Sequence, residues 1–351
     1  MWTFTTGQSF GSGVKMLPIL NEDCPMSSEG LDFAPRRFST NMLPEQRRVP
    51  FWREVFGRQL VRLDIESRSG DPFEAEAEIR ALPELCSVSF ASTAARLERP
   101  RNMLADGDDA LVLLLTRRGT LAVSQRGRDV SLRSGDATLL LQAEPAAMAH
   151  AQIHFQGFLV PRAPVAALVT AIEDAAMRPV RHTNETLRLL TRYVKAISGG
   201  LAIAQPDLRN LVATHVHDLM AKIIGASRDG AALAEERGVA AARLVAIKAD
   251  IIEHVGRGDL TLPALATRHA LTPRSIQRLF ERDGSTFSEF KLEQQVACAR
   301  RMLADRQYSA WTIAAIAVAA GFGDLSYFHR VFRRRFGATP SDVRADFLAR
   351  S

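Results

Sequence analysis

The stretch LPALATRHALTPRSIQRLF, residues 262–280, recurs in altered form as IAAIAVAAGFGDLSYFHRVF, residues 313–332. When the two copies are aligned, Phe280 falls on Phe332. Each copy has two short segments with apolar residues at helical spacing around a turn of small residues, which is typical of a helix-turn-helix. The repeat therefore predicts an all-α region, residues 241–351, that holds two helix-turn-helix units in tandem.

The second helix of each unit is predicted from its first residues and its apolar spacing. Thr272 is a natural N-cap and is followed by Pro273, and Asp324 is the equivalent N-cap in the second copy. The predicted recognition helices therefore cover residues 272–282 and 324–335. Their core-facing positions are Ile276, Leu279 and Phe280 in the first helix, and Phe328, Val331 and Phe332 in the second.

The outer sides of these helices carry side chains suited to DNA. Arginine and glutamine make paired hydrogen bonds to the edges of guanine and adenine, and arginines that do not reach a base meet phosphate. The residues predicted to contact DNA are Arg274, Gln277, Arg278 and Arg282 in the first helix, and Leu325, Ser326, His329, Arg330, Arg333 and Arg334 in the second.

Three of these positions have a second interpretation. Arg278 and Arg330 occupy equivalent places in the repeat, and each could instead clamp the turn of its own unit. Leu325 could contact a thymine methyl group or cover the start of its helix. His329 is expected to be exposed. Of the charges in the run 333–335, at most two can reach bases, because they point in different directions around the helix.

The segment between the two units sets their spacing. Ser285 is predicted to cap a helix that runs to about Ala304. At about 1.5 Å per residue such a helix spans roughly 29 Å, and neighbouring major-groove faces lie about 34 Å apart. A rigid helix of this length could hold two recognition helices one duplex turn apart, with some bending of the DNA.

The charge of the chain is concentrated in the same region. From Arg243 onward the sequence holds 17 Lys and Arg against 11 Asp and Glu, while the rest of the 351 residues holds 28 of each. The whole excess of +6 thus coincides with the repeat, as a phosphate-binding surface requires. No apolar stretch is long enough to cross a membrane and no secretory signal is visible, so we expect a cytoplasmic, nucleoid-associated protein.

The sequence upstream of the repeat divides into a tail and a strand-rich region. Residues 1–36 mix Gly, Ser, Thr and Pro without periodicity and are expected to form a disordered tail. Closely spaced strands joined by Gly turns predict an antiparallel β-barrel over residues 37–160, which at this size can hold one small ligand. The fold class is therefore α+β and multidomain. Strands are expected where Val61, Leu63 and Ile65 alternate with polar residues, and over 73–79, 85–91, 110–117, 119–125, 128–132, 137–142 and 151–159.

Residues 161–225 switch to helical spacing, with helices predicted over 164–177, 184–198 and 206–225. The last of these has an apolar stripe wider than a lone surface helix requires. The stripe fits packing against the barrel and pairing with a second subunit equally well, so a homodimer is one expectation. Residues 226–240 are small and charged and indicate an interdomain linker. The stripe consists of Leu208, Leu211, Val212, His215, Leu219 and Ile223.

Residues with catalytic or metal-binding chemistry form no recognisable site. His150 and His154 would share one face if strands held them, but no carboxylate or third histidine supports them as metal ligands. His215 and His217, two apart on a helix, point in different directions. No Ser-His-Asp order, Walker loop or dinucleotide glycine pattern occurs, so we expect no metal, no cofactor and no enzymatic activity. Cys24, Cys86 and Cys298 are expected to be reduced thiols.

Three segments together resemble the C-terminal domain of the AraC/XylS family of bacterial transcription regulators: LATRHALTPRSIQRLF, FSEFKLEQQVACARRML and IAAIAVAAGFGDLSYFHRVFRRRFGATPSDVR. The region from RFSTNMLPEQRRVPFWREVFG to PRAPVAAL resembles that family's cupin-like regulatory domain. The resemblance implies that the partners are promoter DNA, a small-molecule effector and RNA polymerase. It places base reading on Arg274, Gln277 and Arg278 in the first helix, and on Leu325, Ser326, His329 and Arg330 in the second.

The sequence departs from the family pattern in three places, one of them a pair of residues. Gln295-Val296 stands where the connecting helix usually has Arg-Leu, which removes a possible phosphate contact, while Val343 and Ala270 replace a usual Tyr and a frequent Gly. The leading hypothesis is a sequence-specific DNA-binding transcription regulator, an activator that responds to an effector. The alternatives are a cupin-fold enzyme tethered to DNA and a regulator whose barrel binds a protein partner.

Overall fold

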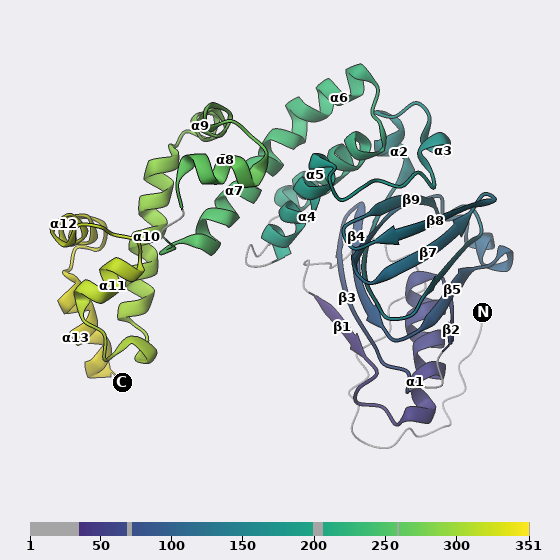
Figure 1. The fold of residues 1–351 in the computed structure, drawn as a ribbon, viewed down its shortest axis with the longest axis horizontal. Coiled ribbons are helices and arrows are strands. Elements are labelled where there is room, and N and C mark those ends of the chain that lie inside the picture. Colours follow the sequence, from purple (N-terminus) through teal and green to yellow (C-terminus); the bar gives the residue numbers. More distant parts are fainter. Residues whose placement is uncertain (1–34, 69–71, 199–205, 258–259, 351) are drawn as a thin grey trace.

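The computed structural model describes residues 35–68, 72–198, 206–257 and 260–350. A two-sheet unit and a helical unit lie at opposite ends of the molecule, with a helical region between them (Figure 1). The tail predicted for residues 1–36 lies outside the described residues apart from its last two. Among the residues described, no helix is both long and apolar enough to cross a membrane.

The described strands form two antiparallel sheets. The first has the order β1-β3-β4-β11-β6-β9, and the second has the order β2-β5-β10-β7-β8. In the first sheet the strands are β1 (Arg36–Ser39), β3 (Ala75–Leu82), β4 (Leu85–Ser92), β6 (Leu111–Arg118), β9 (Ala137–Leu141) and β11 (Ile153–Val160). In the second they are β2 (Asp64–Ser67), β5 (Ala95–Arg99), β7 (Thr120–Gln125), β8 (Arg128–Arg133) and β10 (Ala146–His150).

Both faces of the first sheet are buried. In β6, Val112 and Leu114 point into the space between the sheets, whereas Leu111, Leu113 and Leu115 point to the opposite face, beneath helices. This double burial is the reason that β6 has a continuous apolar run where a half-exposed strand would alternate.

The prediction of a barrel is corrected in one respect, because the two sheets do not close on each other. β8 and β9 stand at the edges of their sheets, and no ladder joins them within the described strands. Residues 176–181, here called the strap, pair with β9 instead: the Val180 N–H donates to Ala137 O (2.7 Å) and the Met177 N–H donates to Leu139 O (3.0 Å). The unit is therefore an open sandwich with the strap along one seam.

A helix that the sequence analysis did not predict packs against the sandwich and inserts aromatic side chains between the sheets. α1 (Glu45–Phe51) continues into a π-helical segment, η1 (Trp52–Val61), and the side chains of Trp52 and Phe56 are buried between the sheets. The Trp52 and Phe56 rings stack with 4.5 Å between centroids. The rings of Phe90 and Phe155 stack beside them at 4.7 Å, so aromatic side chains occupy the space that a barrel would offer to a ligand.

Several other boundaries differ from the expected ones. The strand expected from Val61 begins only at β2, because Val61 ends η1, and β5 and β10 are additional short strands. The expected helix 164–177 is replaced by α2 (Arg162–Ala166) and α3 (Ile172–Ala175), since the residues that follow pair with β9. α4 (Glu185–Ser198) and α5 (Pro206–Ile224) lie close to their predicted bounds, and a short 3-10 helix, η2 (Arg101–Asp106), precedes β6.

The apolar stripe of α5 divides into two parts. Val212, His215, Leu219 and Ile223 are buried, whereas the Leu208 and Leu211 side chains are 44% and 46% exposed. Packing against the sandwich thus accounts for the second half of the stripe and leaves the first half uncovered.

The segment 226–240, whose composition indicates a linker, is helical. α6 (Arg228–Ala234), a π-helical turn η3 (Glu235–Val239) and α7 (Ala240–His254) follow one another without a break. The side chain of Ser227 caps the run by accepting from the Gly230 N–H (3.1 Å). Packing on α5 and α4 stabilises this helical run despite its small and charged residues.

α7 contributes to two cores from opposite sides. Ala242 and Ala246 belong to the core that α4 and α5 share with the sandwich. Leu244, Ile247 and Ile251, on the other face, belong to the core of the first helix-turn-helix. The helix is therefore a rigid connection between the two units.

The C-terminal region is all-α, as the repeat predicts. The first unit consists of α8 (Leu262–His269) and α9 (Pro273–Arg282), and the second of α11 (Ile313–Ala319) and α12 (Leu325–Phe336). α10 (Phe287–Leu303) joins them, with η4 (Arg306–Tyr308) after it and α13 (Pro340–Arg350) at the end. Each unit has its own apolar core, centred on Ile276 and Phe280 in the first and on Phe328 and Phe332 in the second.

The close approach of α7 to the sandwich-side core leads to a testable expectation. Replacing the buried Ala246 with leucine overfills this contact and should destabilise the protein by about 1–3 kcal/mol. Ile252→Ala, on an exposed position of the same helix, should change stability by less than about 0.5 kcal/mol. Differential scanning calorimetry of both variants checks this, and equal melting temperatures would show that α7 does not pack tightly there.

Candidate nucleic-acid interface

The first recognition helix begins where the sequence predicts. The Thr272 hydroxyl accepts a hydrogen bond from the Ser275 N–H (3.1 Å), and Pro273 occupies the first turn. Ile276 and Phe280 are fully buried, which fixes the rotation of α9 about its axis. Its opposite side carries four exposed residues whose side chains form no hydrogen bond or ion pair with other described residues: Arg274, Gln277, Arg278 and Arg282.

The second recognition helix is built in the same way. The Asp324 carboxylate accepts from the Tyr327 N–H (2.6 Å), and Phe328, Val331 and Phe332 are buried. The exposed positions include Leu325, Ser326, Arg330, Arg333 and Arg334.

Two side chains of α12 contact aromatic rings on the same helix. His329, expected to be exposed, is half-buried, because its ring packs edge-on against Phe328 with 5.6 Å between centroids. The Arg330 guanidinium lies 5.5 Å from the centre of the Tyr327 ring on the same helix, and its side chain remains exposed. This cation–π contact holds Arg330 against the helix surface without removing it from solvent.

Arg335 differs from Arg333 and Arg334 because its side chain has an ion-pair partner. Its guanidinium donates to the Glu293 carboxylate on α10 (3.0 Å), so it points at the connecting helix. Arg333 and Arg334 are the members of the run that stay exposed without such a partner among the described residues.

α10 lies between the two recognition helices. It is capped by Thr286 and not by Ser285: Thr286 and Glu289 form a reciprocal capping box, and the helix has 17 residues, or about 25 Å. Figure 1 shows α9 and α12 both nearly end-on, on either side of α10, so their axes run nearly parallel and they do not pack face to face.

Two glycines bring the helix-turn-helix units into close contact. Gly256, after α7, has φ +86°, and a Cβ there would stand 2.0 Å from Ala319 O at the end of α11. Gly321, in the turn of the second unit, has φ +91°, and its carbonyl accepts from the Gln295 side chain (2.7 Å). Gln295 is therefore a buried partner of this turn, so the departure from the family pattern at this position adds a packing contact.

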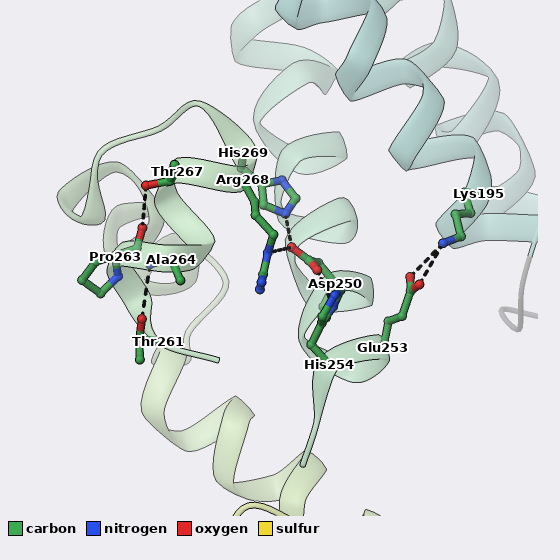
Figure 2. Close-up of polar contacts among 10 residues, drawn as sticks. All are labelled: Lys195, Asp250, Glu253, His254, Thr261, Pro263, Ala264, Thr267, Arg268 and His269. Carbon is green, nitrogen blue, oxygen red and sulfur yellow. Dashed lines mark hydrogen bonds and ion pairs between the residues drawn. The ribbon is translucent and has the colours of Figure 1, made fainter. Parts of the chain in front are cut away.

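A carboxylate on α7 holds the first unit in place (Figure 2). Asp250 accepts from Arg268 Nε (3.1 Å) and contacts His269 Nε2 (2.8 Å), both near the end of α8. Burial raises the pKa of Asp250, but the His269 hydrogen bond and the neighbouring charges outweigh it, so the pKa is lowered. A charged Asp250 thus binds α8 to α7.

On its other side, α7 forms an ion pair with α4. Lys195 donates to both carboxylate oxygens of Glu253, at 3.1 and 2.8 Å, as Figure 2 shows. Both side chains are more than half exposed, so this ion pair contributes at most about 1 kcal/mol. The apolar contact between α4 and α7 is the stronger link.

The histidines considered as ligands do not come together. His150, in β10, lies beside Phe90 in the interior of the sandwich, where burial lowers its pKa to about 4. His154 is on β11 and its Nε2 contacts the Ser89 hydroxyl (2.9 Å), so the two do not share a face. His215 contacts the Tyr193 hydroxyl and His217 contacts Glu84 O, each at 2.8 Å. Among the described residues, no group of three or more His, Cys, Asp or Glu side chains could hold a metal ion.

Comparison with known proteins agrees with both halves of this architecture. Residues 265–346 match a model described as a helix-turn-helix domain, and residues 52–224 match an AraC-binding-like domain. The chain is 25% identical over 323 residues to the transcriptional activator RhrA of Rhizobium meliloti, covering 88% of this chain and 96% of that protein. It is 24% identical to the transcriptional activator NphR of a Rhodococcus species, over 78% of this chain and 82% of that protein.

A similarity to a solved structure spans both units. The AraC-like transcriptional activator CuxR is 18% identical, with a TM-score of 0.48, over 75% of this chain and 94% of that one. The paired recognition helices and the two domain matches define a DNA-binding transcriptional regulator. The chain belongs to the AraC family, with a cupin-like domain of two sheets before its double helix-turn-helix.

The glycine contact between the two units predicts a selective defect. Gly256→Ala should destabilise the helical region by more than about 2 kcal/mol, because a Cβ would overlap a backbone oxygen in a conformation that already disfavours alanine. Gly284→Ala provides the control, since that glycine also has positive φ (+75°) but faces open space, and it should cost only about 1 kcal/mol. Thermal melts of the two variants compare them; similar losses would mean that the units do not meet at Gly256.

Proposed function

We propose that the protein reads two successive major-groove segments of a promoter with α9 and α12. The observation that carries this proposal is the pair of capped, nearly parallel helices whose outer sides hold exposed Arg, Gln and Ser side chains. Bases would be read by Arg274, Gln277 and Arg278 in α9 and by Leu325, Ser326, His329 and Arg330 in α12. Arg282, Arg333 and Arg334 would meet phosphates, which makes the affinity depend on salt.

We further propose that the protein is an activator controlled by a small-molecule effector. The similar proteins RhrA and NphR are both named transcriptional activators. The N-terminal domain of this chain matches an AraC-binding-like model. An activator acts through RNA polymerase, so the polymerase is the second macromolecular partner. The proposed site of action is the nucleoid, in the cytoplasm, and no enzymatic step is required of the sandwich.

A homodimer is the proposed assembly. The exposed Leu208 and Leu211 continue the buried stripe of α5 and supply an apolar surface for a second copy of the chain. Two subunits would place four recognition helices on DNA and raise the affinity through the second attachment.

The role of α9 is tested by Arg274→Ala. A DNA sequence selected by the wild-type protein from a random pool serves as the probe, together with its single-base variants. The substitution should relax discrimination at one or two base pairs by about 1–3 kcal/mol each. Arg335→Ala is the matched control, because its partner is Glu293, and it should leave discrimination unchanged. Gel-shift titrations that show wild-type preferences for Arg274→Ala would refute the assignment of α9.

The proposed dimer surface has its own test. Placing glutamates at both Leu208 and Leu211 should convert the dimer to monomer, because four charges would face each other across the interface. Leu233→Glu, at an exposed leucine on α6, should leave the assembly unchanged. Sedimentation velocity measures both, and a dimer that persists in the double variant would place the interface elsewhere.

A further inference from the structure

An open pocket of about 870 Å³ lies at the seam of the sandwich, between β8 and the strap. This is the side on which β8 and β9 do not pair, so the pocket stands where a closed barrel would have a ladder. A second pocket of about 410 Å³ shares Pro179 and Arg181 with it and reaches the residues just before α4.

Arginines dominate the lining of the seam pocket. Arg128 and Arg133 come from the two ends of β8 and Arg181 from the end of the strap, against a single carboxylate, Asp129. Each guanidinium has five N–H donors and suits a planar carboxylate or a phosphate. All three arginines line one pocket, and they come from two separate segments of the chain.

Two of the three arginines are held in position. Arg128 Nη1 donates to Ala176 O (3.3 Å) and so crosses from β8 to the strap. Arg181 Nη1 donates to the buried Asp136 carboxylate (3.0 Å), which also accepts from the His182 N–H (3.0 Å). The Arg133 side chain forms no hydrogen bond or ion pair with any other described residue, so all five guanidinium N–H donors remain available.

The same two segments also give the pocket an apolar lining, and one of these residues is under backbone strain. Met177 has φ +61°, an unfavourable region for a residue with a side chain, and that side chain is buried between the sheets. Strained residues persist where the surrounding structure fixes them, and they gather at ligand sites and switches. Val130 and Pro179 extend the apolar wall, so the lining suits a ligand with both an acidic group and an apolar part.

The strap connects the pocket to the DNA-binding unit. It leads directly into α4, whose first turn is capped by the Asn184 side chain accepting from the Leu187 N–H (2.9 Å). α4 then packs on α7, which carries Glu253 and Asp250, the residues that contact α4 and α8. The strap, α4 and α7 thus form a continuous series of contacts from the pocket to the DNA-binding unit.

We propose that the seam pocket binds a small organic anion, through a carboxylate or phosphate group, and that occupancy changes the placement of α7. The regulatory half of this inference rests on the proposed function, whereas anion binding by the pocket does not. The effector would then bind at the seam between the sheets, outside the aromatic interior.

The test is isothermal titration calorimetry of the full chain at constant ionic strength, with citrate and pyrophosphate as separate probes. One probe should saturate a single site. Arg133→Ala should weaken its binding about tenfold or more, as the loss of charge-assisted hydrogen bonds requires, with partial recovery in Arg133→Lys. Arg126→Ala is the matched control, because Arg126 lies in the same hairpin, pairs with Glu144 and does not line the pocket.

The outcomes separate the alternatives. Saturation by citrate identifies a carboxylate ligand, and saturation by pyrophosphate a phosphate ligand. The pocket proposal is overturned if neither probe saturates a site, or if Arg126→Ala weakens binding as much as Arg133→Ala.

Gel shifts with the selected DNA test the coupling between the pocket and DNA binding: the bound probe should change DNA affinity in the wild type and not in Arg133→Ala. Binding with no change in DNA affinity overturns the coupling alone, and a failure to bind DNA overturns the proposed function without affecting the pocket.

Discussion

The architecture depends on one helix that is buried on two sides. Ala242 and Ala246 lie one turn apart on the side of α7 that meets the sandwich-side core, and Ile247 and Ile251 lie on the side that meets the first helix-turn-helix. Small side chains allow α4 to approach closely, and larger ones fill the core of the DNA-binding unit. Because side-chain packing resists deformation, a displacement of α4 has to be transmitted by α7 or accommodated by a change of contact.

Much of the C-terminal unit could be predicted because its signals are local. Thr272 and Asp324 cap their helices through hydrogen bonds to residues three positions later, and Phe280 and Phe332 recur at helical spacing. The upstream strands with clear alternation were likewise predictable. β5 (ARLER) and β10 (AAMAH) were missed because neither contains a β-branched or aromatic residue that would indicate a strand, and η1 was missed because its aromatic residues depend on the sandwich around them.

The remaining errors come from contacts between distant segments. Arg335 cannot be distinguished from Arg334 in the sequence, and only the position of Glu293 on α10 gives it an ion-pair partner within the fold. The composition of residues 226–240 predicted a linker, but packing on α5 stabilises these residues as helix. Gln295 stands where the family usually has arginine, and from the sequence this suggests only that a phosphate contact is lost. In the structure its side chain donates a hydrogen bond to the Gly321 carbonyl inside the fold.

These contacts also restrict how DNA binding can be regulated. Gly256, after α7, lies against Ala319 of the second unit, and Gln295 on α10 donates to Gly321 of the same unit. These contacts hold the second unit against α7 and α10, so they restrict the separation of α9 and α12. A signal from the sandwich must therefore act on the DNA-binding unit as a whole. The exposed Lys195–Glu253 pair is too weak to carry such a signal alone, at about 1 kcal/mol or less. The packing of α4 on α7 is the contact whose change would reorient both recognition helices together.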